Sequence, residues 1–301
     1  MACNDYLIKM KDYGKLAGVD PEVWADLVSC TIRVKAWTYK TIAEIYGEAV
    51  WFDSAVTELT DLTPANGFEL LPIDQVMDRA LDLMDNGWNG VSSDRNINWI
   101  AWLDPDNVTS IADSDFRQWN HMVPAYEGVY SELLLWKGAA VDAISGGDIA
   151  ASKPYYQKVC DLILPAINNT LVSNHGNPPY WIPSAASREK WKIVFSNPSL
   201  QFYEIISVII YDYAHNQNNS LNNHFLYSDR NQYLLRPSQA GMDRWSDKEM
   251  NPGGGQDKRF DATFRYPTSA QPVIYKYSVN SRTSMSDVHI ITYRATQYHF
   301  Y

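Results

Sequence analysis

The first two-thirds of the chain carries apolar residues at the spacing of α-helices. Asp20-Pro21-Glu22 is a helix start, because it supplies a capping oxygen, a proline at the first helical position and an acid in the first turn. Apolar residues then recur three and four positions apart at Val23, Trp24, Leu27, Val28, Ile42, Ile45, Tyr46 and Ala49. This pattern predicts a helix from Pro21 to near residue 50, with a break at Gly47.

A second helix is expected directly after Pro72. One face carries the apolar residues Ile73, Val76, Met77, Ala80, Leu81 and Met84, and the opposite face carries Asp78, Asp82 and Asp85. Asn86-Gly87 is typical of a helix end, since glycine adopts the left-handed conformation without strain. Such a helix buries one side and leaves its acidic side in water.

Further helices are predicted along the middle of the chain. They span 124–144, closed by Ser145–Asp148; 152–171, capped by Ser152 and kinked at Pro165; 187–195; and 199–214. The last contains the β-branched run Ile205–Ile210, so a strand competes with a helix there. Ile97–Leu103 is either a strand or a buried helix.

The carboxyl-terminal part has a different pattern. A tract rich in Asn follows His215, and three segments with alternating polar and apolar residues come later, at 259–266, 273–279 and 288–300. These segments predict an antiparallel meander or hairpin. The expected fold class is therefore α+β, with a mainly helical body at about residues 5–215 and a β-rich carboxyl-terminal segment. The expected domains are 1–220 and 221–301.

Charge is distributed unevenly along the chain. Residues 1–110 hold 18 Asp/Glu and 8 Lys/Arg, which matches the net charge of −10 of the whole chain. Residues 222–301 hold 7 acidic and 10 basic residues. With a sequence pI of about 5.0 and no basic stripe, nucleic-acid binding is not expected as a primary role. At most, passive contact with DNA is expected.

Neither a membrane span nor a secretory signal is recognisable. No stretch of about 18 apolar residues occurs, and Met1–Asp5 lacks a basic region followed by an apolar one. The three cysteines, Cys3, Cys30 and Cys160, are far apart and odd in number, which is typical of reduced thiols. The sequence therefore predicts a protein made in a cytoplasm, without membrane partners.

No catalytic, metal or cofactor signature is present. None of the 6 histidines lies in an HExxH motif or at a Cys/His zinc spacing. Gly253-Gly254-Gly255 lacks the Gly-Lys-Ser/Thr of a phosphate loop, and Ser145-Gly146-Gly147 lacks the glycine that precedes the serine of a nucleophile elbow. We therefore expect no enzyme activity, no catalytic or metal-binding residues and no cofactor.

Carbohydrate binding or turnover is the alternative from another class of function. The chain has 11 Trp and 20 Tyr, whose rings suit protein interfaces as well as sugar grooves. Trp99, Trp102 and Trp181 are candidates for such a groove. A glycosidase would also need two carboxyl groups across a cleft. Candidate pairs are Asp74 with Asp78, Glu127 with Glu132, and Asp104 with Asp106.

The chain combines a helical body, the segment Tyr155–Pro165 (YYQKVCDLILP), an Asn- and Tyr-rich composition and a β-rich carboxyl-terminal segment. In these features it resembles structural proteins of tailed bacteriophages that infect Bacteroidota, including the crAss-like group. Connector and ring proteins of such phages combine helical bundles with extended β elements that hold neighbours together. The resemblance implies a virion protein of the head–tail or tail assembly, made in the host cytoplasm. Its partners would be copies of itself in a ring, together with portal or other tail proteins.

For such a ring, the carboxyl-terminal strands would extend a neighbour's sheet or dock in its groove. The residues implied in partner binding are Arg265, Tyr275, Tyr293, Tyr298, Phe300 and Tyr301. The aromatic end Tyr298–Tyr301 is either the last strand of the core or an arm that docks on a neighbouring copy.

Overall fold

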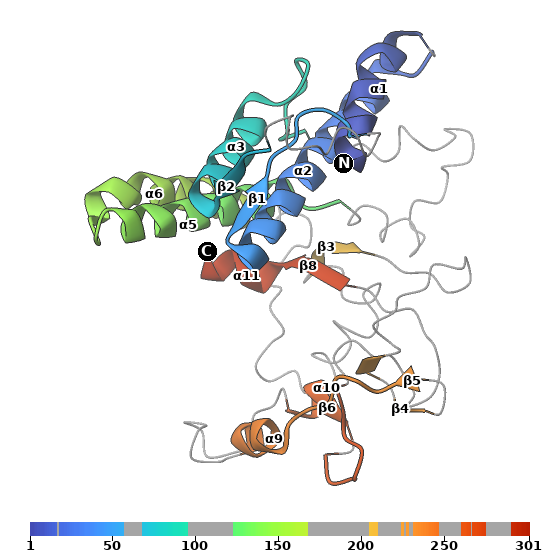
Figure 1. Ribbon diagram of the computed structural model, residues 1–301, viewed down its shortest axis with the longest axis vertical. Helices are drawn as coiled ribbons and strands as arrows, with labels where there is room; N and C mark the ends of the chain where they lie inside the picture. The colour runs from blue at the N-terminus through green and yellow to red at the C-terminus, as the bar shows by residue number, and fades with distance from the viewer. Residues whose placement is uncertain are drawn as a thin grey trace. The chain divides into compact units, whose positions relative to one another are not determined.

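The structure is a computed structural model. It describes residues 1–16, 18–56, 68–95, 123–167, 205–209, 224–225, 227–228, 231–246, 260–265, 267–274 and 290–301. The chain divides into two compact units: unit 1 comprises Met1–Asp113, Val123–Asn174 and Gln297–Tyr301, and unit 2 comprises Ser114–Met122 and His175–Thr296. The described part is mainly helical with a few short strands, which confirms the α+β class and the helical body (Figure 1). The expected domains 1–220 and 221–301 stay a prediction.

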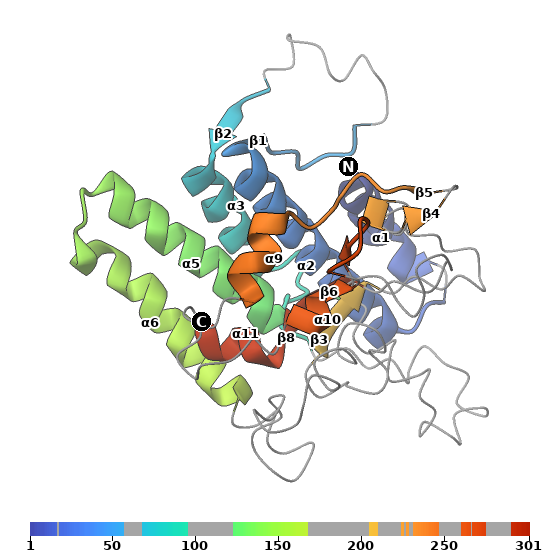
Figure 2. The ribbon, with the colours of Figure 1, turned by 90° about the horizontal axis from the view of Figure 1, so that it is seen from below.

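Unit 1 is built from helices and one pair of short strands. Its elements are α1 (Ala2–Leu16), α2 (Pro21–Tyr46), β1 (Glu48–Val50), β2 (Leu70–Pro72), α3 (Ile73–Asn86), α5 (Tyr126–Ile144) and α6 (Ile149–Pro165). α1 packs against α2, α3 packs against both α2 and α5, and α6 packs against α5. Figures 1 and 2 show α5 and α6 side by side as a helical hairpin.

α2 begins and ends as the sequence predicts. The Oδ1 atom of Asp20 accepts hydrogen bonds from the backbone N–H groups of Glu22 and Val23, at 2.8 and 3.3 Å. The helix ends before Gly47, whose φ of 78° is left-handed and whose N–H donates to the carbonyl of Ala43. The sequence pattern gives no prediction for α1, although this helix supplies a residue of the site described below.

α3 also has the predicted bounds and the predicted buried face. It starts after Pro72 and ends before Gly87, with Val76, Met77, Ala80, Leu81 and Met84 buried. Only glycine fits at position 87, since a Cβ there would lie 2.0 Å from the carbonyl oxygen of Val91 and the φ is 66°.

The predicted cap of α6 is wrong. The helix begins at Ile149, because the side chain of Asp148 accepts a hydrogen bond from the N–H of Ala150 at 3.0 Å. Ser152 is buried inside the helix instead. α6 lies close to α5 where Gly138 leaves room for the ring of Tyr156; a Cβ at position 138 would lie 2.7 Å from that ring.

The core of unit 1 lies between α2, α3, α5 and α6. Its fully buried side chains include Val28, Ile32, Ala36, Val76, Met77, Ala80, Val129, Leu133 and Val159. Burying each of the larger ones stabilises the fold by about 1.5–3 kcal/mol. Ion pairs join the same helices at their edges: Lys40 with Glu132 at 2.6 Å, Lys137 with Asp78 at 2.6 Å and Lys158 with Asp85 at 3.2 Å.

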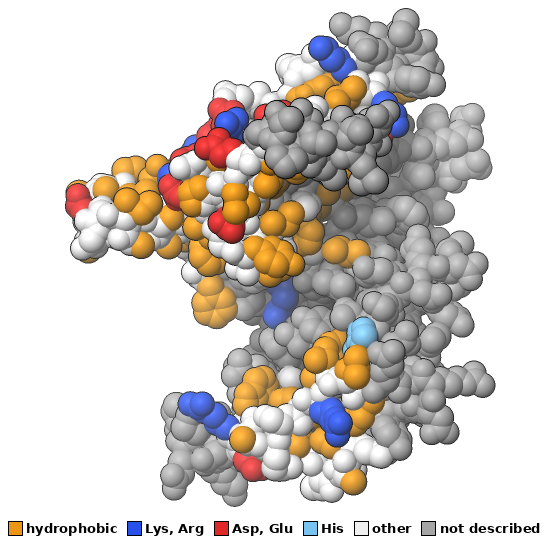
Figure 3. Space-filling model, viewed as in Figure 1, with side chains coloured by type: hydrophobic (Ala, Val, Ile, Leu, Met, Phe, Trp, Pro, Cys, Tyr) orange, Lys and Arg blue, Asp and Glu red, His pale blue; other side chains and the backbone are white. Residues whose placement is uncertain are grey.

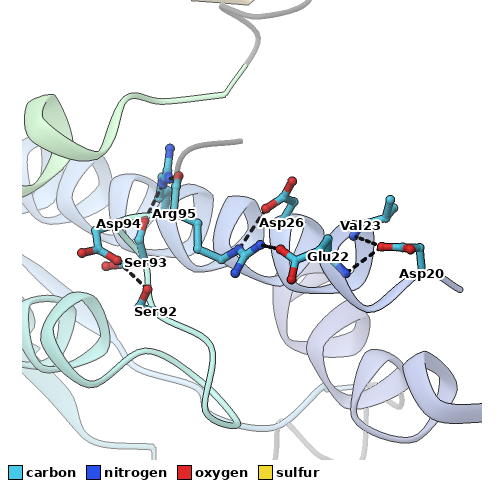
Figure 4. Close-up of polar contacts among 9 residues, drawn as sticks. Asp20, Glu22, Val23, Asp26, Ser92, Ser93, Asp94 and Arg95 are labelled. Atoms are coloured by element: carbon cyan, nitrogen blue, oxygen red, sulfur yellow. Dashed lines mark hydrogen bonds and ion pairs between the residues drawn. The ribbon is translucent and has the colours of Figure 1, made fainter. Parts of the chain in front are cut away.

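A buried polar network fixes the chain after α3 onto α2 (Figure 4). The Nε atom of Arg95 lies 2.9 Å from Oδ1 of Asp26, whose side chain is 1% exposed, and its Nη2 contacts Glu22. The Nε of Arg33 donates to the carbonyl of Ser93 at 2.6 Å, and its Nη2 donates to the carbonyl of Arg95. Two arginines therefore satisfy the Asp26 carboxylate and backbone carbonyls that the fold removes from water, while Glu22 stays exposed.

Unit 2 contains short strands and helices. Its described elements are β3 (Ile205–Ile209), β4 (Tyr227–Ser228), β5 (Asn231–Gln232), α9 (Gln239–Ser246), α10 (Phe260–Thr263), β6 (Phe264–Arg265), β7 (Val273–Ile274) and β8 (Ile290–Arg294). The strands pair antiparallel as β3 with β8, β4 with β5, and β6 with β7. α11 (Ala295–Phe300) follows β8 and carries the chain from unit 2 into unit 1.

Three sequence predictions fail in this region. The segment 259–266, predicted as a strand, forms the helix α10 over Phe260–Thr263, and only Phe264–Arg265 is a strand. The helix predicted over 199–214 is wrong at its centre, where β3 forms, since β-branched side chains favour a strand that pairs with β8. The strand predicted over 288–300 is only five residues long, and the aromatic end forms the helix α11 instead. The segment 187–195 and Ile97–Leu103 lie outside the described residues.

Candidate functional site

A pocket lies on unit 1 at the point where the chain leaves β1. It has a volume of about 610 Å³ and is lined by Val50–Val56, Phe68, Glu69, Leu71 and Arg79. Antiparallel pairing of β1 with β2 brings its two sides together, and α3 contributes Arg79. The volume is in the range of ligand-binding pockets, about 300–1,000 Å³.

Residues 51–56 are held in place by α1 and α2. Asn4 of α1 is 2% exposed, and its Nδ2 donates to the carbonyls of Phe52 and Ser54 at 2.7 and 3.0 Å. The hydroxyl of Tyr39, on α2, accepts a hydrogen bond from the N–H of Phe52 at 2.8 Å. These bonds fix the backbone of the segment, because they satisfy polar groups that would otherwise need water.

Trp51 and Asp53 are tied to α2. The Trp51 ring stacks on the Tyr39 ring with centroids 4.0 Å apart, and its Nε1 donates to Oδ1 of Asp53 at 2.7 Å. The Nζ of Lys35 lies 3.5 Å from the same oxygen and 5.0 Å from the centroid of the Trp51 ring. Burial lowers the pKa of Lys35, and the charge of Asp53 opposes that change. Trp51 is therefore already engaged by its own chain, at its N–H and on one ring face.

Three charged groups of the pocket are open to a ligand. The side chain of Asp53 is 73% exposed, and both contacts described above use its Oδ1, which leaves Oδ2 available. Glu69 and Arg79 are exposed, and within the described part of the chain neither has a hydrogen bond or ion pair. A carboxylate accepts two or more hydrogen bonds and a guanidinium donates several, so both can hold neighbouring hydroxyl groups.

Aromatic surface stands beside these charges. The rings of Phe52 and Phe68 meet edge to face, with centroids 5.3 Å apart and an interplanar angle of 64°. Both rings are half-buried, so each has part of its surface exposed. The pocket therefore combines apolar ring surface with hydrogen-bonding groups of both signs, an arrangement that suits a ligand with apolar patches and many hydroxyl groups.

Other kinds of site find less support. Among the residues that the structure describes, no group of three or more His, Cys, Asp or Glu is placed to hold a metal ion. None of the described helices has the length and apolar character needed to cross a bilayer. Exposed apolar side chains occur at Ile45, Tyr46, Ile144 and Ile149, and Figure 3 shows hydrophobic and acidic side chains mixed over the helices of unit 1.

The residues implied in partner binding have different environments. Tyr293 is fully buried on β8, Tyr298 is 3% exposed, Tyr301 is half-buried, and Phe300 is 83% exposed. Arg265 lies on β6, and Tyr275 lies outside the described residues. Within the described part, only Phe300 of the four aromatic residues is largely exposed to solvent.

The aromatic end of the chain contacts its own helices. The hydroxyl of Tyr301 donates to Glu132 of α5 at 2.7 Å, and Glu132 also pairs with Lys40. Desolvation raises the pKa of both Tyr298 and Tyr301, and the charge of Glu132 adds to this effect. Tyr298 and Tyr301 are one helical turn apart and meet at 6.1 Å between centroids, so both lie on the body of one copy.

Of the residues that the sequence indicated for carbohydrate binding or turnover, the structure describes only two of the carboxylate pairs. Trp99, Trp102 and Trp181, with Asp104 and Asp106, lie outside the described residues. In the other two proposed carboxylate pairs, Asp78 binds Lys137 and Glu132 binds Lys40. These two carboxylates therefore connect helices.

Sequence reasoning missed the pocket. The sequence shows two short segments in which an acidic residue follows an aromatic one, Trp51-Phe52-Asp53 and Phe68-Glu69. The first follows the helix end at Gly47, and the second precedes the helix start at Pro72. Nothing in the sequence shows that β1 and β2 bring these two segments together, since each strand is only three residues long.

Comparison with known proteins gives a fold relationship. No family model matches the chain, and no curated protein sequence matches it significantly. Among solved structures, a SusD-like protein from Bacteroides fragilis is similar, with a TM-score of 0.56 and 12% sequence identity. This chain shares the fold of that SusD-like protein over the matched region. The match covers 97% of this chain and 60% of the other protein, so this chain spans less than two-thirds of that protein's length.

The likeness to a SusD-like protein corrects the function expected from the sequence. The phage ring or connector role is wrong, because the helical body and short strands belong to a SusD-like fold. Tyr298 and Tyr301 pack on their own unit. The crAss-like resemblance has no support in these comparisons. The expected partners and the expected location in a virion stay untested predictions.

Proposed function

We propose that this protein binds glycans and that the pocket of unit 1 is the binding site. The SusD-like fold supports the proposal, since SusD-like proteins form a glycan-binding family. The observation that carries it is the combination, in one pocket of about 610 Å³, of the Phe52 and Phe68 rings with Asp53, Glu69 and Arg79. The alternative reading of the sequence, in which the aromatic content serves sugars, is thereby favoured.

The pocket can hold a sugar through two kinds of contact. The C–H faces of a sugar ring would pack on the exposed parts of the phenyl rings, where both surfaces lose water. The hydroxyl groups would donate to Asp53 and Glu69 and accept from Arg79, in place of the water that these groups otherwise bind. Each hydrogen bond to a charged group contributes about 1.5–3 kcal/mol.

The proposed role is binding without turnover. A glycosidase needs one carboxylic acid and one carboxylate on opposite sides of the scissile bond. In the pocket, Oδ1 of Asp53 is held by Lys35 and by the indole N–H of Trp51. Such a carboxylate is suited to accepting hydrogen bonds from a ligand.

A glycan array followed by calorimetry on the wild-type protein and three variants tests the site. Phe68→Ala and Arg79→Ala are expected to weaken binding of the array-selected glycan about tenfold or more each, because each removes a direct contact. Phe300→Ala is the matched control, since Phe300 is 83% exposed and is not part of the pocket. It should bind as the wild type does.

Two results would contradict the proposal. Failure of the wild-type protein to bind any glycan would reject the function. Full binding by Phe68→Ala and Arg79→Ala, with loss of binding in variants of Trp99, Trp102 or Trp181, would keep the function and move the site to the residues that the sequence first indicated.

A further inference from the structure

We propose that the pocket of unit 1 selects neutral, hydroxyl-rich glycans over anionic ones. This inference rests on the proposed function and names the ligand class of the same site. It depends on the charges that line the pocket, on the contacts of the buried Lys35, and on the hydrogen-bonding groups that remain open to a ligand.

The charges at the pocket are predominantly negative. Of the lining residues, all of which the structure describes, Asp53 and Glu69 carry carboxylates and Arg79 is the one cation. An anionic group that approached Arg79 would also approach two carboxylates. Like charges that line one pocket oppose each other, which lowers affinity for a uronate or a sulfate.

Lys35 does not balance this charge for a ligand. Its side chain is 7% exposed, and its Nζ is directed at Oδ1 of Asp53 and at the ring of Trp51. It is not among the residues that line the pocket. Lys35 therefore holds Asp53 in place from the protein side, while Oδ2 of Asp53 is left for the ligand.

The open groups match the chemistry of a neutral sugar. Two carboxylates offer acceptors for hydroxyl donors, and neighbouring hydroxyls on a sugar ring can reach both oxygens of one carboxylate. Arg79 supplies donors for a ring oxygen or a further hydroxyl. A neutral glycan can thus use all three groups, whereas an anionic glycan uses Arg79 at the cost of repulsion from the other two.

The test compares neutral glycans with charged counterparts of the same backbone on the full chain. Each neutral oligosaccharide on the array is paired with its sulfated or uronate form, and dissociation constants are measured for both. Wild-type protein should bind the neutral member of a pair about tenfold more tightly. Glu69→Gln should strengthen binding of the charged member about threefold, because it removes one like charge of an exposed site.

A matched control separates local charge from net charge. Glu48→Gln makes the same change on β1, at an exposed residue that does not line the pocket, and should leave both affinities unchanged. If the charged member binds as tightly as the neutral one, and Arg79→Gln weakens it most, the selectivity is wrong while the glycan-binding function stands. If neither member of any pair binds, the function fails and the selectivity with it.

Discussion

Two carboxylates of unit 1, Asp26 and Asp53, show how the same ion-pair chemistry serves two ends. Asp26 is paired with Arg95, and its side chain is 1% exposed. Asp53 is paired with Lys35, and here the lysine is buried while 73% of the carboxylate is exposed. The first pair joins α2 to the chain after α3. In the second pair only the lysine is buried, so Oδ2 of Asp53 faces the pocket and a ligand can reach it.

The largest effect is expected from breaking the buried pair. Asp26→Ala should lower the free energy of unfolding by about 3 kcal/mol, because Arg95 loses its buried partner. Urea denaturation followed by circular dichroism measures this. The matched Asp53→Ala variant should cost far less, and equal losses in the two variants would refute the contrast.

The second-largest effect is expected from alkaline pH, which should lower the free energy of unfolding. Burial raises the pKa of Cys30, one helical turn from Asp26, from 9.0 to about 11. Between these values the unfolded chain releases a proton that the folded chain keeps, so the stability falls as pH rises, by about 1.4 kcal/mol per pH unit. Urea midpoints measured at pH 8–10.5 should show this loss of stability. In Cys30→Ala the loss that begins near pH 9 should be absent. A flat profile in the wild type would contradict the assignment.

A smaller effect on stability is expected at Asn4, which holds the pocket segment 51–56 in place. Asn4→Ala should cost about 1.5 kcal/mol, since the carbonyls of Phe52 and Ser54 lose their donor. Calorimetry should also show weaker glycan binding, because residues 51–56 are less ordered before the ligand arrives. Asp5→Ala on the same helix, which removes an exposed ion pair with Lys9, is the control. Unchanged affinity in Asn4→Ala would show that the pocket does not need this support.

The smallest effect on stability is expected at the exposed carboxylate itself. Asp53→Ala should lower the free energy of unfolding by about 1 kcal/mol, because the carboxylate is exposed and the buried Lys35 keeps its contact with the Trp51 ring. It should nevertheless weaken glycan binding, since an open acceptor is lost. A variant that loses stability and keeps full affinity would reverse the roles assigned to the two carboxylates.

Local signals in the sequence were sufficient for much of unit 1. The cap at Asp20, the glycines at 47 and 87, and the apolar face of α3 act within a few residues, so each is readable without the rest of the fold. The start of α6 was misplaced because Asp148 and Ser152 are both competent caps, and only the observed turn selects the first.

Long-range pairing explains what the sequence could not show. Ile205–Ile209 carries no periodicity that separates strand from buried helix, and its partner β8 begins more than 80 residues later. The pocket likewise depends on β1 meeting β2, and on Asn4 reaching segment 51–56 from the first helix. The aromatic end was expected in a strand, whereas contact with Glu132 fits the helix that places Tyr298 and Tyr301 on one side.

The docking of Tyr301 on α5 has a consequence for the timing of folding. Glu132 and Tyr301 are 169 positions apart, and Gln297–Tyr301 belong to unit 1. A ribosome makes the helices of this unit long before it makes Gln297–Tyr301, which pack on them. Unit 1 therefore completes its packing only after unit 2 has been synthesised, and this high contact order is expected to slow its last folding step.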